Sequence, residues 1–174
     1  MSRPENIVLF GEGKTEAVFL RHLTQLYRDE IGKTKVKIDA GQGGSPKQVA
    51  NRLIRKVLNI GSYDRSLLLL DCDIPHDIPK KWLKENSIGV VASAPMCLEG
   101  LFLTMLDDLP PRSERAQSKH WKRRFHQNHL KTDRDSDIVA KLSDKCPTLF
   151  PRELIDIERA KHPCLSKILS FLNV

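Results

Sequence analysis

The sequence has few cysteines, few aromatic residues and no long apolar run. No two of its four cysteines have the Cys-x-x-Cys spacing, which argues against a zinc ribbon or a redox pair. No apolar stretch approaches the roughly 20 residues that a membrane-spanning helix needs. The polar segment from Met1 to Asn6 does not resemble a secretory signal. We therefore expect a cytoplasmic protein with reduced thiols and no membrane partner.

The sequence also lacks the complete form of three ligand-binding motifs. Residues 11–15 (Gly-Glu-Gly-Lys-Thr) look like the end of a phosphate-binding P-loop, but Val8 stands where that motif needs a glycine. The glycines of 41–44 lack the spacing of a dinucleotide fingerprint. The acids of 133–137 have the spacing of calcium-loop ligands, but Ile138 replaces the glycine that must follow. A helix cap in a solvated turn is the more typical role of those acids.

Four short apolar runs are typical of buried strands, and each is followed by a segment with helical spacing of its apolar residues. The runs are 6–10, 36–38, 67–70 and 88–92. Strands that alternate with helices form a parallel sheet with helices on both faces and right-handed crossovers. With 174 residues, the chain is long enough for one domain with a sizeable core. We expect a Rossmann-like α/β fold with a four-stranded, mostly parallel sheet.

Cap and turn residues set the expected limits of the helices in this part of the chain. Thr15 is the expected cap of a helix that runs to about Glu30 and stops at Gly32. Ser45 is the expected cap of a helix that starts at Pro46. The remaining expected elements are the end of that helix near Gly61, a loop over 71–79, a helix over 79–86, and a helix with Leu98, Leu101, Phe102, Met105 and Leu106 on one side.

The last third of the chain differs in character from the rest. A Leu-Pro-Pro segment at 109–111 leads into a strongly basic stretch. The expected elements after it are a helix over 138–145, a linker bracketed by Pro147 and Pro151, and helices over 155–159 and 165–172. We therefore divide the chain into an α/β core (1–109) and a basic linker with an α-helical extension (110–174), packed together as a single compact domain.

Positive charge is concentrated in that basic stretch. The chain has a net charge of +7, and residues 112–134 contain eight Lys or Arg against two acids. A local basic block favours a polyanionic partner such as nucleic acid. Trp121 and Phe125 share a helix face, where they either stack on bases or pack the segment onto the body. The residues expected to contact a nucleic-acid backbone are Lys14, Lys119, Lys122, Arg123 and Arg124, and the histidines at 120, 126 and 129 are expected at the surface.

Carboxylates follow the ends of three expected strands. Glu12 follows the first strand, Asp71 and Asp73 follow the third, and Glu99 follows the fourth. Glu16 lies on the same helix face as Glu12. Ligands bind at the carboxyl ends of parallel strands, and carboxylates crowded there repel one another unless a cation is present. Oxygen ligands of this kind select Mg²⁺ or Mn²⁺. The alternative is that these acids are helix caps that interact with helix dipoles.

These residues carry a resemblance to a known family. Glu12 followed by Asp71-x-Asp73 resembles the TOPRIM domain of topoisomerases, primases and several nucleases. The string Glu-Gly-Lys-Thr-Glu at 12–16 and the segment 93–99 are similar to OLD-type and RloB-like TOPRIM proteins. The resemblance covers roughly residues 6–107 and implies a TOPRIM fold. It implies that Glu12 is a metal ligand or general acid/base, that Asp71 and Asp73 bind metal, that Glu16 and Glu99 complete a second metal site, and that Lys161 is a late catalytic lysine.

The resemblance also implies a function. We expect a Mg²⁺- or Mn²⁺-dependent nuclease that cleaves DNA or RNA in bacterial defence against phage, with a separate ATPase polypeptide as a partner. One alternative is a housekeeping RNA-processing TOPRIM nuclease. The other is a non-catalytic nucleic-acid-binding or regulatory subunit of an ATPase complex.

Overall fold

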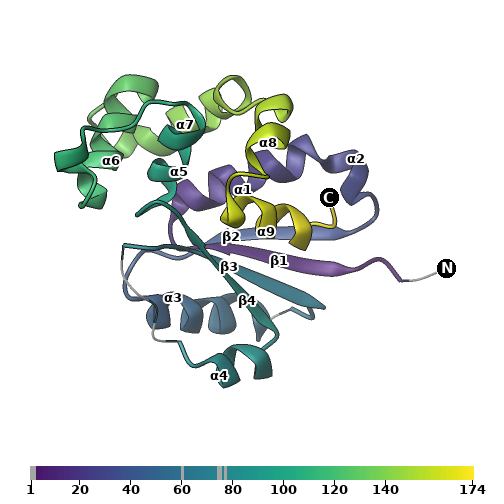
Figure 1. Ribbon diagram of the computed structural model, residues 1–174. Helices are drawn as coiled ribbons and strands as arrows, with labels where there is room; N and C mark the ends of the chain where they lie inside the picture. Colours follow the sequence, from purple (N-terminus) through teal and green to yellow (C-terminus); the bar gives the residue numbers. More distant parts are fainter. Residues whose placement is uncertain (1–2, 60, 74–75, 77) are drawn as a thin grey trace.

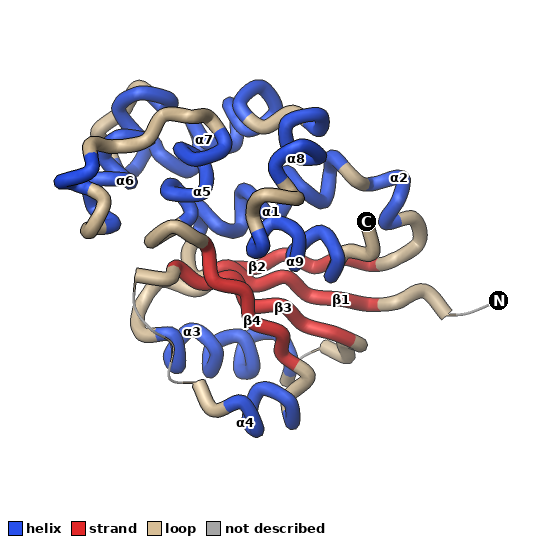
Figure 2. The backbone as a smooth tube through the Cα atoms, in the orientation of Figure 1, coloured by secondary structure: helices blue, strands red, loops and turns tan. Residues whose placement is uncertain are grey.

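The computed structural model describes residues 3–59, 61–73, 76 and 78–174, and its centre is a four-stranded parallel sheet (Figures 1 and 2). The strands are β1 (Asn6–Gly11), β2 (Lys35–Ala40), β3 (Arg65–Asp71) and β4 (Ile88–Ser93). Their order is β2-β1-β3-β4, and all three pairings are parallel. The Rossmann-like α/β fold is therefore confirmed, with a sheet that is wholly rather than mostly parallel.

Helices cover both faces of the sheet (Figure 1). On one face lie α3 (Pro46–Leu53), the π-helix η1 (Ile54–Leu58) and α4 (Lys80–Glu85). On the other lie α1 (Lys14–Leu26), α2 (Arg28–Ile31), α5 (Leu98–Met105), α6 (Ser118–Phe125), the π-helix η3 (His126–Leu130), α7 (Asp135–Leu149), α8 (Arg152–Glu158) and α9 (Pro163–Phe171). A 3₁₀ turn, η2 (Arg112–Glu114), precedes α6. None of the helices in the described residues is both long and apolar enough to span a membrane.

The strands divide their side chains between two hydrophobic clusters. Ile7 and Leu9 of β1 belong to the cluster under α1 and α5, whereas Val8 and Phe10 belong to the cluster under α3 and α4. Successive strand residues point to opposite faces, so a strand that is covered on both sides is apolar throughout. This burial explains why the expected strands were recognisable as continuous apolar runs.

Residues of the C-terminal extension belong to the same cluster as α1 and α5. The rings of Phe125 and Phe150 pack around Phe102, with centroids 5.0 and 4.6 Å from its ring. Trp121 is 3% exposed and its indole N–H donates to the Arg115 carbonyl oxygen at 3.0 Å. Of the two roles left open for Trp121 and Phe125, the structure shows packing.

Several expected helix limits are confirmed and several are wrong. Ser45 caps α3 and Pro46 is its first residue, and Gly32 ends α2 with a φ of 61°. Thr15 is not a cap, because α1 already begins at Lys14 after Gly13. The helix expected to reach Glu30 is also interrupted at Tyr27, which separates α1 from α2.

Two further expectations differ from the structure. Asp71 is the last residue of β3 rather than part of a loop, because it pairs with Ser93 of β4. Residues 74, 75 and 77 of the expected loop lie outside the described residues. Pro147 does not open a linker, because α7 continues through it to Leu149. Pro147 is exposed in the last turn, but Cys146 before it and Phe150 after it are buried, so their packing outweighs the intrinsic cost of the proline.

Candidate functional site

The acids at the carboxyl ends of β1 and β3 meet. A Glu12 carboxylate oxygen accepts a hydrogen bond from the Asp71 backbone N–H at 3.1 Å. The two strands are neighbours because the chain places β2 on one side of β1 and β3 on the other. A point where the strand order reverses is where open parallel sheets bind ligands. The expected placement of Glu12 and Asp71 is therefore observed.

Asp71 connects three elements at this edge. One of its carboxylate oxygens accepts hydrogen bonds from the Ser93 hydroxyl and from the Leu98 backbone N–H, each at 3.0 Å. The other lies 2.9 Å from the Lys122 ammonium of α6. The side chain of Asp71 is 7% exposed, so α6 supplies a cation to a largely buried carboxylate. Lys122 was expected on a nucleic-acid backbone, and its contact with Asp71 was not foreseen.

Glu16 approaches the same edge from the first turn of α1. A Cβ atom on Gly11 would lie 2.6 Å from the Glu16 Cβ, so the glycine lets the helix start close to the strand end. One Glu16 carboxylate oxygen accepts from the Gly13 backbone N–H at 2.8 Å. Burial, with the charges of Asp71 and Glu99, raises the pKa of Glu16 to about 8. Glu16 is therefore mainly protonated at neutral pH.

Glu99 and His126 form a buried pair with unsatisfied atoms. Glu99 Oε1 lies 3.5 Å from His126 Nε2, and their side chains are 5% and 15% exposed. Neither Glu99 Oε2 nor His126 Nε2 has a hydrogen-bond partner among the described residues. Burial acts to raise the pKa of Glu99, but His126 and Lys122 outweigh it, and the pKa is lowered. The expectation of a surface position is wrong for His126, because its place on η3 turns it toward α5.

Glu12, Glu16, Asp71 and Glu99 together form what we call the acid cluster. The pKa values of its other two members, Glu12 and Asp71, are shifted as well. Burial raises the pKa of Glu12, and the charges of Asp71 and Asp73 add to the shift. Burial likewise raises the pKa of Asp71, although Lys122 opposes the shift. For Lys122, burial acts to lower the pKa, but Asp71 and Glu99 outweigh it and the pKa is raised. Four carboxyl groups therefore share one close ammonium, and even with Glu16 protonated the acids outnumber it.

The cluster suits a hard divalent cation in its chemistry. Its donors are carboxylate oxygens, and the partnerless Glu99 Oε2 is the kind of buried atom that a ligand would satisfy. As the side chains stand, no three Asp, Glu, His or Cys residues within the described ranges are close enough together to hold a metal. Lys122 and the Gly13 N–H occupy two of the oxygens instead. The metal-binding role of Glu12, Glu16, Asp71, Asp73 and Glu99 stays a prediction.

The last expected catalytic residue, Lys161, lies between α8 and α9. Its ammonium is 2.7 Å from a Glu158 carboxylate oxygen. This contact with Glu158 does not link Lys161 to the acids at the carboxyl edge of the sheet, and its catalytic role stays a prediction.

The other expected nucleic-acid contacts fall into two groups. Arg124 is engaged with both the side chain and the carbonyl oxygen of Asp108. Lys14, Lys119 and Arg123 are exposed, and within the described part of the chain their side chains form no ion pair or hydrogen bond. The free cations of α6 are thus fewer than the sequence suggested.

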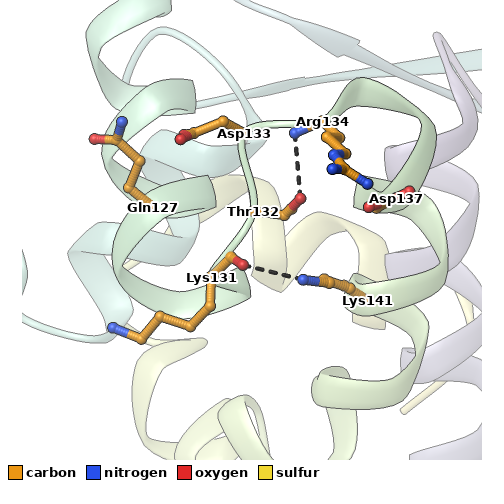
Figure 3. A pocket seen from close by; sticks show the side chains of 7 residues that line it. All are labelled: Gln127, Lys131, Thr132, Asp133, Arg134, Asp137 and Lys141. Carbon is orange, nitrogen blue, oxygen red and sulfur yellow. Dashed lines mark hydrogen bonds between the residues drawn. The ribbon is translucent and has the colours of Figure 1, made fainter.

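A separate cavity of about 600 Å³ lies between η3 and the start of α7 (Figure 3). Its lining alternates bases and acids, and includes Lys131, Asp133, Arg134, Asp137 and Lys141. The Lys141 ammonium donates to the Lys131 carbonyl oxygen at 3.0 Å, as Figure 3 shows. Because charges of both signs line it, this cavity does not select an anion or a cation, and we assign it no role.

No protein-family model, curated protein or solved structure matches the chain at a significant level. The site must therefore be judged from its own residues. Sequence reasoning overlooked that Lys122 and His126 both reach the acid cluster. Their spacing of four residues, in step with the buried Trp121 and Phe125, is the signal that would have placed them on an inward-facing side.

Proposed function

We propose that this protein is a metal-dependent hydrolase that cleaves phosphodiester bonds in nucleic acid. The observation that carries the proposal is the acid cluster of Glu12, Glu16, Asp71 and Glu99. Its members come from α1, β3, α5 and the turn after β1, and they outnumber the nearby positive charges. Perturbed carboxyl groups gathered at a ligand-binding edge are typical of functional sites. Acids that served only as helix caps would not need to crowd one another in this way.

The chain's own residues have distinct roles in this proposal. Glu12, Asp71 and Asp73 would hold Mg²⁺ or Mn²⁺, and Glu16 and Glu99 would complete a second position. When bound, such ions supply an activated water and stabilise charge on the phosphate oxygens. Glu12 is suited to proton transfer by its raised pKa. Lys122 keeps a positive charge beside Asp71, where it would offset the charge of the scissile phosphate.

The resemblance to TOPRIM nucleases supports the same proposal. On the ground of this resemblance, the proposal includes a bacterial defence setting, a cytoplasmic location and a separate ATPase partner. Lys161 would be the late catalytic lysine of this resemblance.

One observation favours a second function. Lys122 already neutralises Asp71, and Glu16 lowers its own charge by keeping a proton near neutral pH. A cluster balanced in this way can persist without metal. The second candidate is therefore a nucleic-acid-binding subunit whose acidic edge is structural.

Cleavage assays separate the two functions. Labelled single- and double-stranded DNA and RNA are incubated with the protein in Mg²⁺, Mn²⁺ or EDTA. We expect cleavage only with metal, and a loss of about 100-fold or more in Glu12→Gln and Asp71→Asn, the scale seen when one charge-stabilising group at a reaction centre is removed. The preferred substrate among the four also decides between DNA and RNA.

The amino ends of the strands offer matched controls. Glu5→Gln and Asp64→Asn make the same chemical changes at the opposite edge of the sheet, where both acids contact cations. These two variants should cleave like the wild type. Cleavage that persists in EDTA or in the site variants contradicts the metal mechanism. Absence of any cleavage, together with salt-sensitive binding, favours the binding subunit.

A further inference from the structure

A groove of about 320 Å³ opens at the free edge of the sheet, beside the carboxyl end of β2. β2 is an edge strand, so no further strand lies beyond it between the helices of the two faces of the sheet. Lys14 and Arg21 of α1 line the groove from one face, and Lys56 of η1 lines it from the other. A cleft outside the carboxyl ends of parallel strands is a common place for a ligand.

The charges of this groove are unbalanced. Lys14, Arg21 and Lys56 are exposed, and their side chains form no ion pair or hydrogen bond with other described residues. The acid that lines the groove, Asp39, accepts a hydrogen bond from the neighbouring Ala40 N–H at 2.8 Å. The groove therefore presents three uncompensated cations against one carboxylate, which favours an anion.

The groove adjoins the acid cluster through the backbone. Gly41 N–H donates to the Gly11 carbonyl oxygen at 2.9 Å, and Gly43 N–H donates to the Glu12 carbonyl oxygen at 3.2 Å. A Cβ atom on Gly41 would lie 2.6 Å from the Glu12 carbonyl oxygen, so only glycine permits this approach. The floor of the groove is thus fixed directly against the residue that follows β1.

The cations of α6 are placed differently. Lys122 is held by Asp71 and Arg124 by Asp108, so two of the strongest candidates in the basic segment already have counter-ions. Among the described residues, the unpaired cation nearest to Glu12 in the chain is instead Lys14, which lines the groove. A polyanion that reaches the acid cluster would find free positive charge on the β2 side of it.

We propose that this groove binds backbone phosphates of a single nucleic-acid strand, on the flank of the acid cluster opposite to α6. Arg21 and Lys56, which sequence patterns did not single out, join Lys14 as phosphate contacts. The inference rests on the proposed function for the position of the scissile phosphate. It adds a direction for the strand, from the acid cluster across the end of β2.

The test compares two triple variants with the same change in charge. The groove variant carries Lys14→Ala, Arg21→Ala and Lys56→Ala. The control variant carries Arg28→Ala, Lys33→Ala and Lys35→Ala, three exposed cations around the amino end of β2. Binding of fluorescent single-stranded oligonucleotides of increasing length is measured by anisotropy in EDTA, over a range of salt concentrations.

We expect the groove variant to bind long oligonucleotides about tenfold more weakly, with a salt slope reduced by roughly 2, since each phosphate contact contributes about 0.7 to the slope for single strands. A dinucleotide has a single backbone phosphate and can contact only part of the groove, so its affinity should change much less. The control variant should behave like the wild type at every length. Circular dichroism checks the fold, and Lys56→Glu alone provides a milder second variant that should show the same length dependence.

Two results overturn the inference: a groove variant that binds every length like the wild type, or a control variant that loses as much affinity. The first result excludes the groove as a phosphate-binding site. The second shows that affinity depends on the total charge of the protein and not on the groove. Cleavage by the wild type with metal, measured in parallel, tests the proposed function separately. Glu12-dependent cleavage with an unaffected groove variant rejects the groove alone. Length-dependent loss without any cleavage rejects the nuclease and keeps the groove.

Discussion

The two ends of the sheet treat their carboxylates in opposite ways. At the amino end, Glu5 forms two hydrogen bonds with the Arg65 guanidinium, at 2.5 and 2.7 Å, and this contact lowers the pKa of Glu5. At the carboxyl end, burial raises the pKa of Glu16 to about 8, and burial also raises the pKa of Glu12 and Asp71. The same type of group is stabilised as an ion at the amino end and destabilised as an ion in these three acids at the carboxyl end, where Glu99 is the exception because His126 and Lys122 lower its pKa.

The difference indicates which end of the sheet to test for a function. A paired surface acid contributes little to folding but costs nothing. A buried acid among other acids lowers the stability of the folded chain unless it is protonated or meets a cation. Such an arrangement persists where it serves a ligand, so the carboxyl end is the end to test.

The largest expected effect is on Glu16. Because its folded pKa is about 8 and its ordinary pKa is 4.5, the folded state binds more protons than the unfolded state between these values. Stability therefore falls as the pH rises from 4.5 through 8. Glu16→Gln removes this dependence and should stabilise the metal-free protein by about 3 kcal/mol at pH 7, at roughly 1.4 kcal/mol per pKa unit.

Urea unfolding in EDTA at pH 5 and pH 7 measures this effect. The gain from Glu16→Gln should be small at pH 5 and large at pH 7. The matched change Glu5→Gln at the amino end should be slightly destabilising instead, because it breaks the contact with Arg65. Equal effects of the two substitutions would abolish the contrast between the two ends.

The second effect concerns the cation that the carboxyl end does have. Lys122→Met leaves the buried Asp71 without its close positive charge. Removal of one partner of a buried pair costs about 3–5 kcal/mol, and the half-exposed ammonium of Lys122 reduces this to about 2 kcal/mol. Asp71→Asn in the same chain should restore most of the loss, because a neutral amide needs no counter-ion. If the double variant loses as much free energy of unfolding as the two single variants together, Lys122 does not act through Asp71.

The sheet was predictable because local and tertiary preferences agree in it. The runs at 67–70 and 88–92 are apolar on both faces and end in turns, so few other structures would bury them. The helix limit expected at Pro147 was wrong because the local preference of proline is outweighed by the packing of the buried Cys146 and Phe150 on either side of it. A local sequence pattern does not show which residues, distant in the chain, pack together in the core.

The candidate site was predictable in part for the same reason. Glu12 and Asp71 are each one step from a strand end, and parallel topology alone brings such residues together. The contacts from Lys122 and His126 were hidden, because they depend on how α6 and η3 dock, which local spacing does not determine. The groove beside β2 forms where α1, β2 and η1 come together, and no local sequence pattern determines how these three segments are placed relative to one another.

The smallest expected effect is at the amino end. Arg65→Met breaks the ion pair with Glu5 and the stacking of the guanidinium on Phe171, and both groups are partly exposed. The loss should stay below about 1 kcal/mol and shrink in high salt, as for other surface pairs. Because the pKa of Glu5 is lowered from 4.5, the contribution of the pair is present above that pH and is lost as the pH falls. Urea unfolding should therefore show a smaller difference from the wild type at pH 3 than at pH 7, with the loss of stacking on Phe171 remaining at both. A loss as large as that of Lys122→Met would mean that the amino end is as electrostatically demanding as the carboxyl end, and the contrast between the two would no longer mark the site.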